Sequence, residues 1–105
     1  MPKPSTMVNK PKYHLSRLAD NDLLNIAEYT IQEFGIKQAR QYRDALENCF
    51  LTLAENPNMG RKADELATGL KRFEHQSHIV FYLKDNEDLF IVRVLHNRVD
   101  VIRHF

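Results

Sequence analysis

The sequence of 105 residues predicts one α+β domain: a strand, a helical hairpin and a three-strand meander, with a mostly antiparallel sheet packed on the two helices. Three observations lead to this prediction. The length fits a single domain. Apolar side chains recur at steps of three and four before Pro57 and alternate with a period of two after it. A single glycine, Gly35, separates two long helical stretches, which leaves room only for a helical hairpin.

The N-terminal segment, residues 1–11, holds three of the four prolines and almost no large apolar side chains. We expect it to be a flexible arm, because it cannot bury enough surface to become ordered. The folded domain then spans residues 12–105. It begins with a short strand over residues 12–16, in which Tyr13 and Leu15 share one face.

Two helices follow this strand. Ser16 offers an N-cap for the first helix, and Asp20 and Asp22 place negative charge in its first turns, where it suits the helix dipole. The helix ends before Gly35, and the second helix is expected over residues 36–55. The apolar stripes of the two helices are Leu23, Ile26, Ala27, Thr30, Ile31 and Phe34, and Ala39, Tyr42, Leu46, Phe50 and Leu53.

Three strands are expected in the second half, over residues 70–75, 78–84 and 89–96. The middle strand carries large side chains on both faces, which is typical of a central strand covered on both sides. One face is expected to meet the helices, with Phe50 and Phe81 in the core between them. The other face needs cover from a partner or from the apolar side chains of the C-terminal tail. These are Val99, Val101, Ile102 and Phe105.

Composition excludes several classes of protein. The formal net charge is +1, which argues against a protein that attracts nucleic acid through a large positive charge. Any basic patch must therefore be created by folding. The single cysteine, Cys49, allows no disulfide framework and is expected to pack in the core. No signal peptide and no membrane-spanning stretch are visible, so we expect a cytoplasmic protein without a membrane partner.

No metal site or cofactor site is predicted. His75 and His78 are three apart in strand-like sequence and would point to opposite faces, which makes them a poor ligand pair. The glycines do not form a phosphate-binding loop, and the G-x-S-x-G pattern of hydrolases is absent.

Basic residues on the predicted strands suggest one candidate chemistry. Arg72, Arg93 and His96 could converge on one face of the sheet. RNA cleavage by attack of a 2′-hydroxyl needs an acid, a base and cations around the phosphate, and these three residues could supply them. The neighbouring residues that could assist are Arg61, Lys71 and Arg98.

A structural interpretation of the same residues is also open. Arg93 stands in an apolar run and needs a partner for its charge, for which Asp100 and Asp64 are candidates. Arg72 could pair with Glu74 or another surface acid. A stand-alone RNA-binding module would use stacking aromatics, but core packing explains them as well. These aromatics are Phe73, Phe81, Tyr82 and Phe90.

An ordered set of segments resembles the ParE toxins of the RelE/ParE superfamily. The segments are residues 13–16, 22–23, 29–30, 34–35, 53–57, 60–61, 69–73, 81–82 and 91–96. The resemblance implies the RelE/ParE fold and a type II toxin–antitoxin module. It implies a toxin that inhibits DNA gyrase, blocks replication and forms a hetero-oligomer with a ParD-like antitoxin. Operator DNA would be reached only through that antitoxin.

The superfamily also contains the RelE branch, in which the fold is a ribosome-dependent mRNA endonuclease. Here Asp100 stands near the position where the nucleases tend to place a ring, and no tyrosine follows Tyr82, so the resemblance favours a gyrase inhibitor without catalytic residues. A nuclease using Arg72, Arg93 and His96 remains the alternative, beside a plain interaction domain without toxicity. The candidates for target binding are Arg61, Arg72, Arg93, His96, Arg98, Val101, Ile102 and Phe105.

Overall fold

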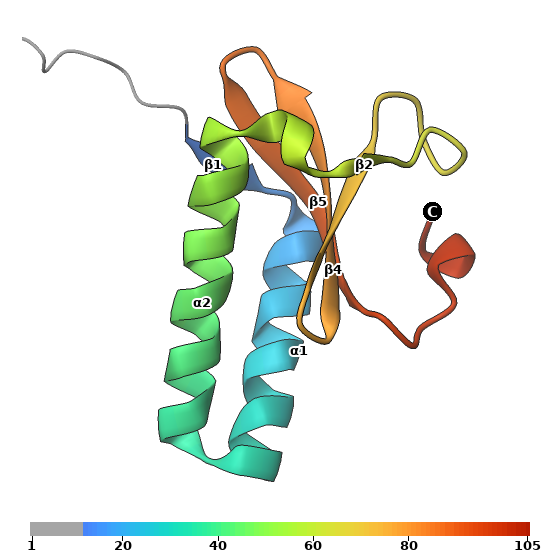
Figure 1. The fold of residues 1–105 in the computed structure, drawn as a ribbon. Helices are drawn as coiled ribbons and strands as arrows, with labels where there is room; N and C mark the ends of the chain where they lie inside the picture. Colours follow the sequence, from blue (N-terminus) through green and yellow to red (C-terminus); the bar gives the residue numbers. More distant parts are fainter. Residues whose placement is uncertain (1–11) are drawn as a thin grey trace, which may run out of the picture.

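The computed structural model describes residues 12–105, so the arm expected over residues 1–11 lies outside the described residues. The elements are β1 (Tyr13–Leu15), α1 (Arg17–Phe34), α2 (Ile36–Glu55), the 3-10 turn η2 (Pro57–Met59), β2 (Arg61–Lys62), β3 (Lys71–His75), β4 (His78–Asp85), β5 (Asp88–His96) and the 3-10 turn η3 (Val101–His104). The strands form one sheet in the order β1-β5-β4-β3-β2, and β1 runs parallel to β5 while the other pairs are antiparallel. The helical hairpin lies along one side of this sheet (Figure 1). The α+β prediction is confirmed.

The helical hairpin has the boundaries that the sequence predicts. The Ser16 side chain accepts a hydrogen bond from the Ala19 N–H at 2.9 Å and caps α1. Gly35 ends α1 with a positive φ of 91°, a conformation that favours glycine, and its N–H donates to the Ile31 carbonyl. α2 starts at the next residue. None of the helices within residues 12–105 is both long enough and apolar enough to cross a membrane.

The sheet has five strands, where the sequence predicts four. The additional strand, β2, has two residues, too few for an alternating pattern to be visible in sequence. Gly60 makes it possible, because a Cβ there would collide with the Tyr82 hydroxyl and come within 2.9 Å of the Arg72 carbonyl. Instead, the Tyr82 hydroxyl accepts the Gly60 N–H and donates to the Pro57 carbonyl, which ties the end of α2 to the sheet.

Two apolar clusters cover the two faces of the central strand β4. The first lies between the sheet and the helices and contains Phe50 and Tyr82. Cys49 belongs to it, and burial raises the pKa of its thiol to about 11, so it packs as an apolar group. The second cluster lies on the opposite face and contains Phe81, together with Leu95. The expected place of Phe81 between the helices and the sheet is therefore wrong, although its side chain is fully buried.

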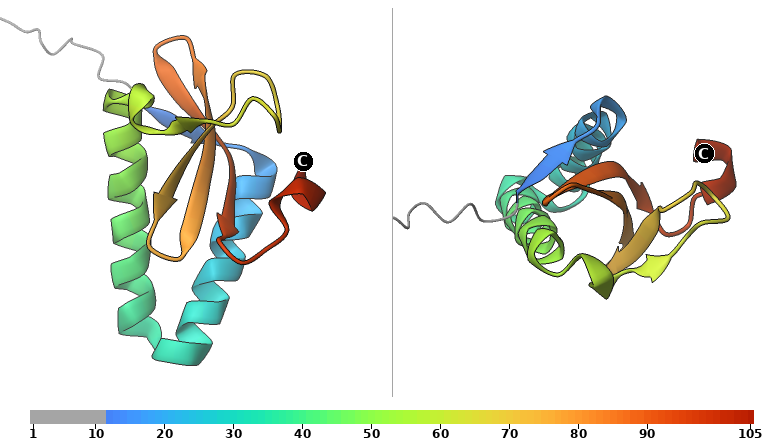
Figure 2. Two further views of the ribbon diagram at one scale, coloured as in Figure 1. Left: turned by 45° about the vertical axis from the view of Figure 1, so that its right-hand side comes forward. Right: turned by 90° about the horizontal axis from the view of Figure 1, so that it is seen from above.

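The second face of the sheet is covered by two segments of the chain itself. The loop between β2 and β3 contributes Ala63 and Leu70, a contribution that the sequence did not indicate. The tail contributes Val101, and the Phe105 ring meets the Phe81 ring edge-on at 4.9 Å. In the view from above, this loop and the tail lie on the side of the sheet that faces away from the helices (Figure 2). Cover by the tail, one of the two expectations, is thus found.

Candidate functional site

The open edge of β5 is completed by polar groups at the start of α1. β1 pairs with β5 only as far as Ile91. Beyond that point the Ser16 N–H donates to the Ile91 carbonyl, and the Ser16 hydroxyl donates to the Val92 carbonyl at 2.7 Å. The Asp22 carboxylate accepts the Val94 N–H at 2.9 Å. Ser16 and the Asp22 side chain therefore satisfy the main chain of β5 where no strand of residues 12–105 lies beside it.

Arg93 is held by the same carboxylate. Its Nε and Nη2 each donate to one oxygen of Asp22 at 2.8 Å, and the two side chains are only 12% and 10% exposed. This hydrogen bond raises the pKa of Arg93, so the guanidinium stays charged and paired. Such a bidentate pair leaves little of the guanidinium free to stabilise a phosphate.

Arg93 forms a structural salt bridge, as the structural interpretation predicts, but the prediction of Asp100 or Asp64 as its partner is wrong. Asp100 pairs with Arg103 at 3.5 Å, and Asp64 accepts the Gly69 N–H at 2.9 Å. The partner is Asp22, for which the sequence predicts an interaction with the helix dipole. One signal pointed to its burial: Asp22 precedes Ile26 by four residues and so lies on the apolar stripe of α1.

Arg72 lies on the opposite face of the sheet from the helices. It is paired in register with Phe81, and its guanidinium lies 5.5 Å from the centre of the Phe81 ring. Its Nε is buried without a hydrogen-bond partner. The partner expected for Arg72, Glu74, is 3.6 Å from Arg61 instead.

His96 belongs to a cluster of rings on the helix side. The Tyr42 hydroxyl and His78 Nδ1 are 2.6 Å apart, and the His78 and His96 rings meet edge-on at 5.4 Å. Burial, and then the neighbouring His96 and His75, lower the pKa of His78 to about 4, so this imidazole is neutral at pH 7. His96 Nδ1 accepts the Arg98 N–H at 3.1 Å, which fixes the ring.

The structure brings together only two of the three residues of the nuclease alternative: Arg93 and His96 line one hollow, with Arg98 and His104, and Arg72 is separate from it. Arg93 is paired with α1, Arg72 lies over Phe81 on one face, and His96 lies with the helices on the other. Residues 12–105 also contain no group of three or more His, Cys, Asp or Glu side chains that could hold a metal ion.

The remaining candidates for target binding lie on the tail and the far edge of the sheet. Ile102 is 74% exposed, while Val101 is half-buried in the second cluster. Phe105 is partly exposed beside Phe81, and Arg98 is exposed after the end of β5. Arg61 is exposed on β2, and Arg98 lines the same hollow as Arg93 and His96.

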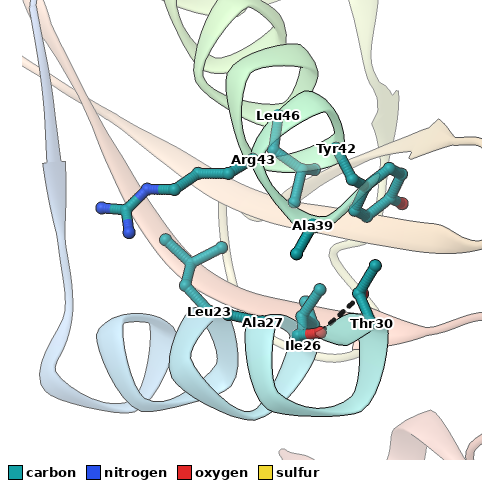
Figure 3. A pocket seen from close by; sticks show the side chains of 8 residues that line it. All are labelled: Leu23, Ile26, Ala27, Thr30, Ala39, Tyr42, Arg43 and Leu46. Carbon is teal, nitrogen blue, oxygen red and sulfur yellow. Dashed lines mark hydrogen bonds between the residues drawn. The ribbon is translucent and has the colours of Figure 1, made fainter. Parts of the chain in front are cut away.

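The helices carry two further surface features that the sequence did not single out. A small gap between α1 and α2 is lined mostly by apolar side chains from both helices, and its Thr30 hydroxyl donates to the Ile26 carbonyl (Figure 3). With Arg43 as its one charged lining residue, it is a packing gap within the hairpin. A wider groove runs from the end of α1 to His78 and His96, bordered by the exposed rings of Tyr29 and Phe34.

Comparison with known proteins identifies the family of this chain. A family model described as the ParE toxin of the type II toxin–antitoxin system parDE matches residues 13–101. Toxin ParE1 of Mycobacterium tuberculosis is 37% identical over 94 residues, which cover 89% of this chain and 96% of that protein. Toxin ParE1 of Caulobacter vibrioides is 37% identical over 92 residues, covering 88% and 95%. Toxin ParE of Escherichia coli is 33% identical over 91 residues, covering 86% and 88%.

A solved structure shares the fold. It is described as the chromosomal ParDE TA system from P. aeruginosa and superposes with a TM-score of 0.69. The sequence identity is 16%, and the match covers 83% of this chain and 96% of that one.

Proposed function

The chain belongs to the ParE toxin family of type II toxin–antitoxin systems, and we propose that it inhibits DNA gyrase and is neutralised by a ParD-like antitoxin. In this proposal the toxin traps gyrase on cleaved DNA and blocks replication. It acts by binding and uses no catalytic residue. Operator DNA is contacted only by the antitoxin in the complex.

The pairing of Arg93 with Asp22 is the observation that carries the non-enzymatic proposal. A nuclease on this sheet would need cations around the scissile phosphate and an acid or base beside them. Arg93 already satisfies a buried carboxylate, and breaking that pair would leave an uncompensated charge inside the domain. Arg72 and His96 lie on different faces, so they cannot act on one phosphate without a large rearrangement.

The target surface in this proposal is the exposed part of the tail. Ile102 and Phe105 offer apolar contacts, and Arg98 offers a positive charge. Val101 holds the tail on the sheet and positions these residues. A larger contact with gyrase could also include Arg61, Arg72 and His96. Arg93 has a structural role in its pair with Asp22.

Two parallel assays test the proposal. Purified protein is added to gyrase with supercoiled DNA, and to translating ribosomes with an mRNA. We expect cleaved DNA to accumulate in the first assay and the mRNA to stay intact in the second. Ribosome-dependent cuts in the mRNA, with gyrase unaffected, would replace the proposal by the nuclease alternative.

A matched pair of variants locates the surface. Ile102→Asp places a charge on an exposed side chain of the tail, and Leu24→Asp does the same on an exposed side chain of α1. We expect Ile102→Asp to lower the accumulation of cleaved DNA about tenfold, equivalent to about 1.4 kcal/mol of binding, and Leu24→Asp to leave it unchanged. Neither variant should lower the melting temperature, since both side chains are exposed. Equal activity of the two variants would exclude the tail as the target surface.

A further inference from the structure

A hollow of about 570 Å³ opens where α1, the end of β5 and the C-terminal turn η3 come together. Its polar lining consists of Asn25 and Tyr29 of α1, Arg93 and His96 of β5, and Arg98 and His104 farther along the chain. We call it the β5-end hollow. Its volume lies within the range of sites that hold small ligands.

The lining of the β5-end hollow is positively charged. Among the described residues that line it, Asp22 is the only carboxylate, and Arg93 already neutralises its charge. Arg98 is exposed and adds a permanent positive charge. His96 and His104 add further positive charge when they are protonated. The lining therefore favours an anionic ligand.

Two nitrogen atoms in this lining are unused hydrogen-bond donors. Arg93 binds Asp22 through Nε and Nη2, so Nη1 lies outside the pair, and it is not buried. His96 Nδ1 accepts the Arg98 N–H, so the ring proton of neutral His96 lies on Nε2. Both side chains are held in place by the bonds that they already make. The two donors are therefore preorganised for an oxygen anion such as phosphate.

An exposed aromatic ring borders the same hollow. Tyr29 is 60% exposed, and its ring pairs with no other aromatic ring within residues 12–105. Proteins hold unpaired nucleotides with this combination, in which a ring stacks on the base while cationic donors bind the phosphate.

We propose that the β5-end hollow binds one phosphate of a DNA strand and that Tyr29 stacks on the adjoining base. Arg98 supplies the charge, and Nη1 of Arg93 and Nε2 of His96 donate to the phosphate oxygens. The inference rests on the proposed function, because the cleaved DNA that gyrase holds presents strand ends to this site. The toxin then binds gyrase and the cleaved DNA together, which stabilises the cleaved state.

The first test measures binding of the full chain to a labelled oligodeoxyuridylate of ten residues by fluorescence anisotropy. Two-dimensional NMR should show the largest shifts at the Tyr29 and His96 rings. Inorganic phosphate should bind at least tenfold more weakly, since it makes no contact with Tyr29. Equal binding of phosphate would show a general anion site and would overturn the inference. An oligouridylate of the same length that binds at least tenfold more tightly would assign the hollow to RNA instead.

The salt dependence tests whether one phosphate is held. The affinity of a single strand should fall about threefold between 50 and 200 mM salt if one phosphate is neutralised. A fall of about twentyfold or more would require about three neutralised phosphates. Such a fall would show that the strand follows a longer basic surface, which contradicts a site for one phosphate.

Three variants locate the site. Arg98→Glu should weaken binding of the oligodeoxyuridylate at least tenfold, and Tyr29→Ala should weaken it about tenfold through the loss of stacking. Arg40→Glu, the same charge change at an exposed site of α2 outside the hollow, is the matched control and should leave binding unchanged. Melting temperatures check that all three variants fold. Equal losses in Arg40→Glu and Arg98→Glu would mean that only the net charge matters, and the inference would fail.

Gyrase separates this inference from the proposed function. Tyr29→Ala should bind gyrase without DNA as the wild type does, and should accumulate about tenfold less cleaved DNA. If the wild type and Tyr29→Ala trap cleaved DNA equally, the inference fails and the proposed function stands. If the oligodeoxyuridylate binds in the hollow and the wild type leaves gyrase unaffected, the strand site stands and the proposed function fails.

Discussion

At the scale of single residues, the ion pair between Arg93 and Asp22 joins α1 to β5. The Asp22 carboxylate also accepts a hydrogen bond from the Val94 N–H. Arg93→Ala should therefore cost about 3–5 kcal/mol of unfolding free energy, because the Asp22 charge stays buried without its partner. Denaturant melts measure this loss. Arg103→Ala is the control, since its pair with Asp100 is exposed and should contribute under about 1 kcal/mol. Equal losses in the two variants would contradict the structural part given to Arg93.

His78 gives the stability a dependence on pH. The folded state lowers the pKa of His78 from the ordinary 6.5 to about 4, so the unfolded chain takes up the proton first as the pH falls. The stabilising contribution is complete above about pH 6.5 and is lost towards pH 4. We expect this loss to be on the order of 2 kcal/mol.

Melts between pH 7 and pH 4 test this expectation. His78→Phe removes the titrating group and should flatten the dependence, whereas Leu24→Phe, at an exposed site on α1, should leave it as in the wild type. Other groups that face His78 also shape the curve: His75 and His96 oppose its protonation, Asp22 favours it, and the Tyr42 hydroxyl is its hydrogen-bond partner. An identical slope in wild type and His78→Phe would show that His78 does not titrate in this range.

At the scale of elements, the two faces of the sheet are stabilised separately. Phe50→Ala and Phe81→Ala should each cost about 3–5 kcal/mol, since both side chains are fully buried. Only Phe81→Ala should also release the tail, because Phe105 packs on Phe81 and nothing comparable links Phe50 to it.

Hydrogen exchange of the Phe105 amide, which donates to the Ile102 carbonyl, distinguishes the two variants. We expect faster exchange at this amide in Phe81→Ala and unchanged exchange in Phe50→Ala under conditions where both remain folded. Faster exchange in both variants would mean that the two clusters unfold as one unit.

At the scale of the whole molecule, the domain exposes large apolar side chains along the helical hairpin, including Tyr29, Phe34 and Ile36. An antitoxin segment that folds onto this surface should give a large negative heat-capacity change, because apolar area leaves water. Isothermal titration calorimetry at several temperatures measures it. Tyr29→Ala should weaken binding of the antitoxin, and Leu51→Ala, equally apolar but at the far end of α2, is the control. A heat-capacity change near zero would contradict an apolar interface.

The sequence by itself determined the features that depend on neighbours along the chain. The cap at Ser16, the break at Gly35, the two helices and the three long strands follow from capping, backbone freedom and hydrophobic period, which act over a few residues. The same ordered pattern identified the family, because the ParE toxins match this sequence over most of its length.

The tertiary structure alone decided which distant groups meet. Arg93 pairs with an aspartate 71 residues away, a choice that depends on how α1 docks against the open edge of β5. The face on which Phe81 lies depends on which segments cover the sheet, and β2 forms because Gly60 lets the main chain approach Tyr82. The separation of Arg72 from Arg93 and His96 has the same origin. Strand register and packing determine where side chains lie, whereas the local sequence determines only the elements that carry them.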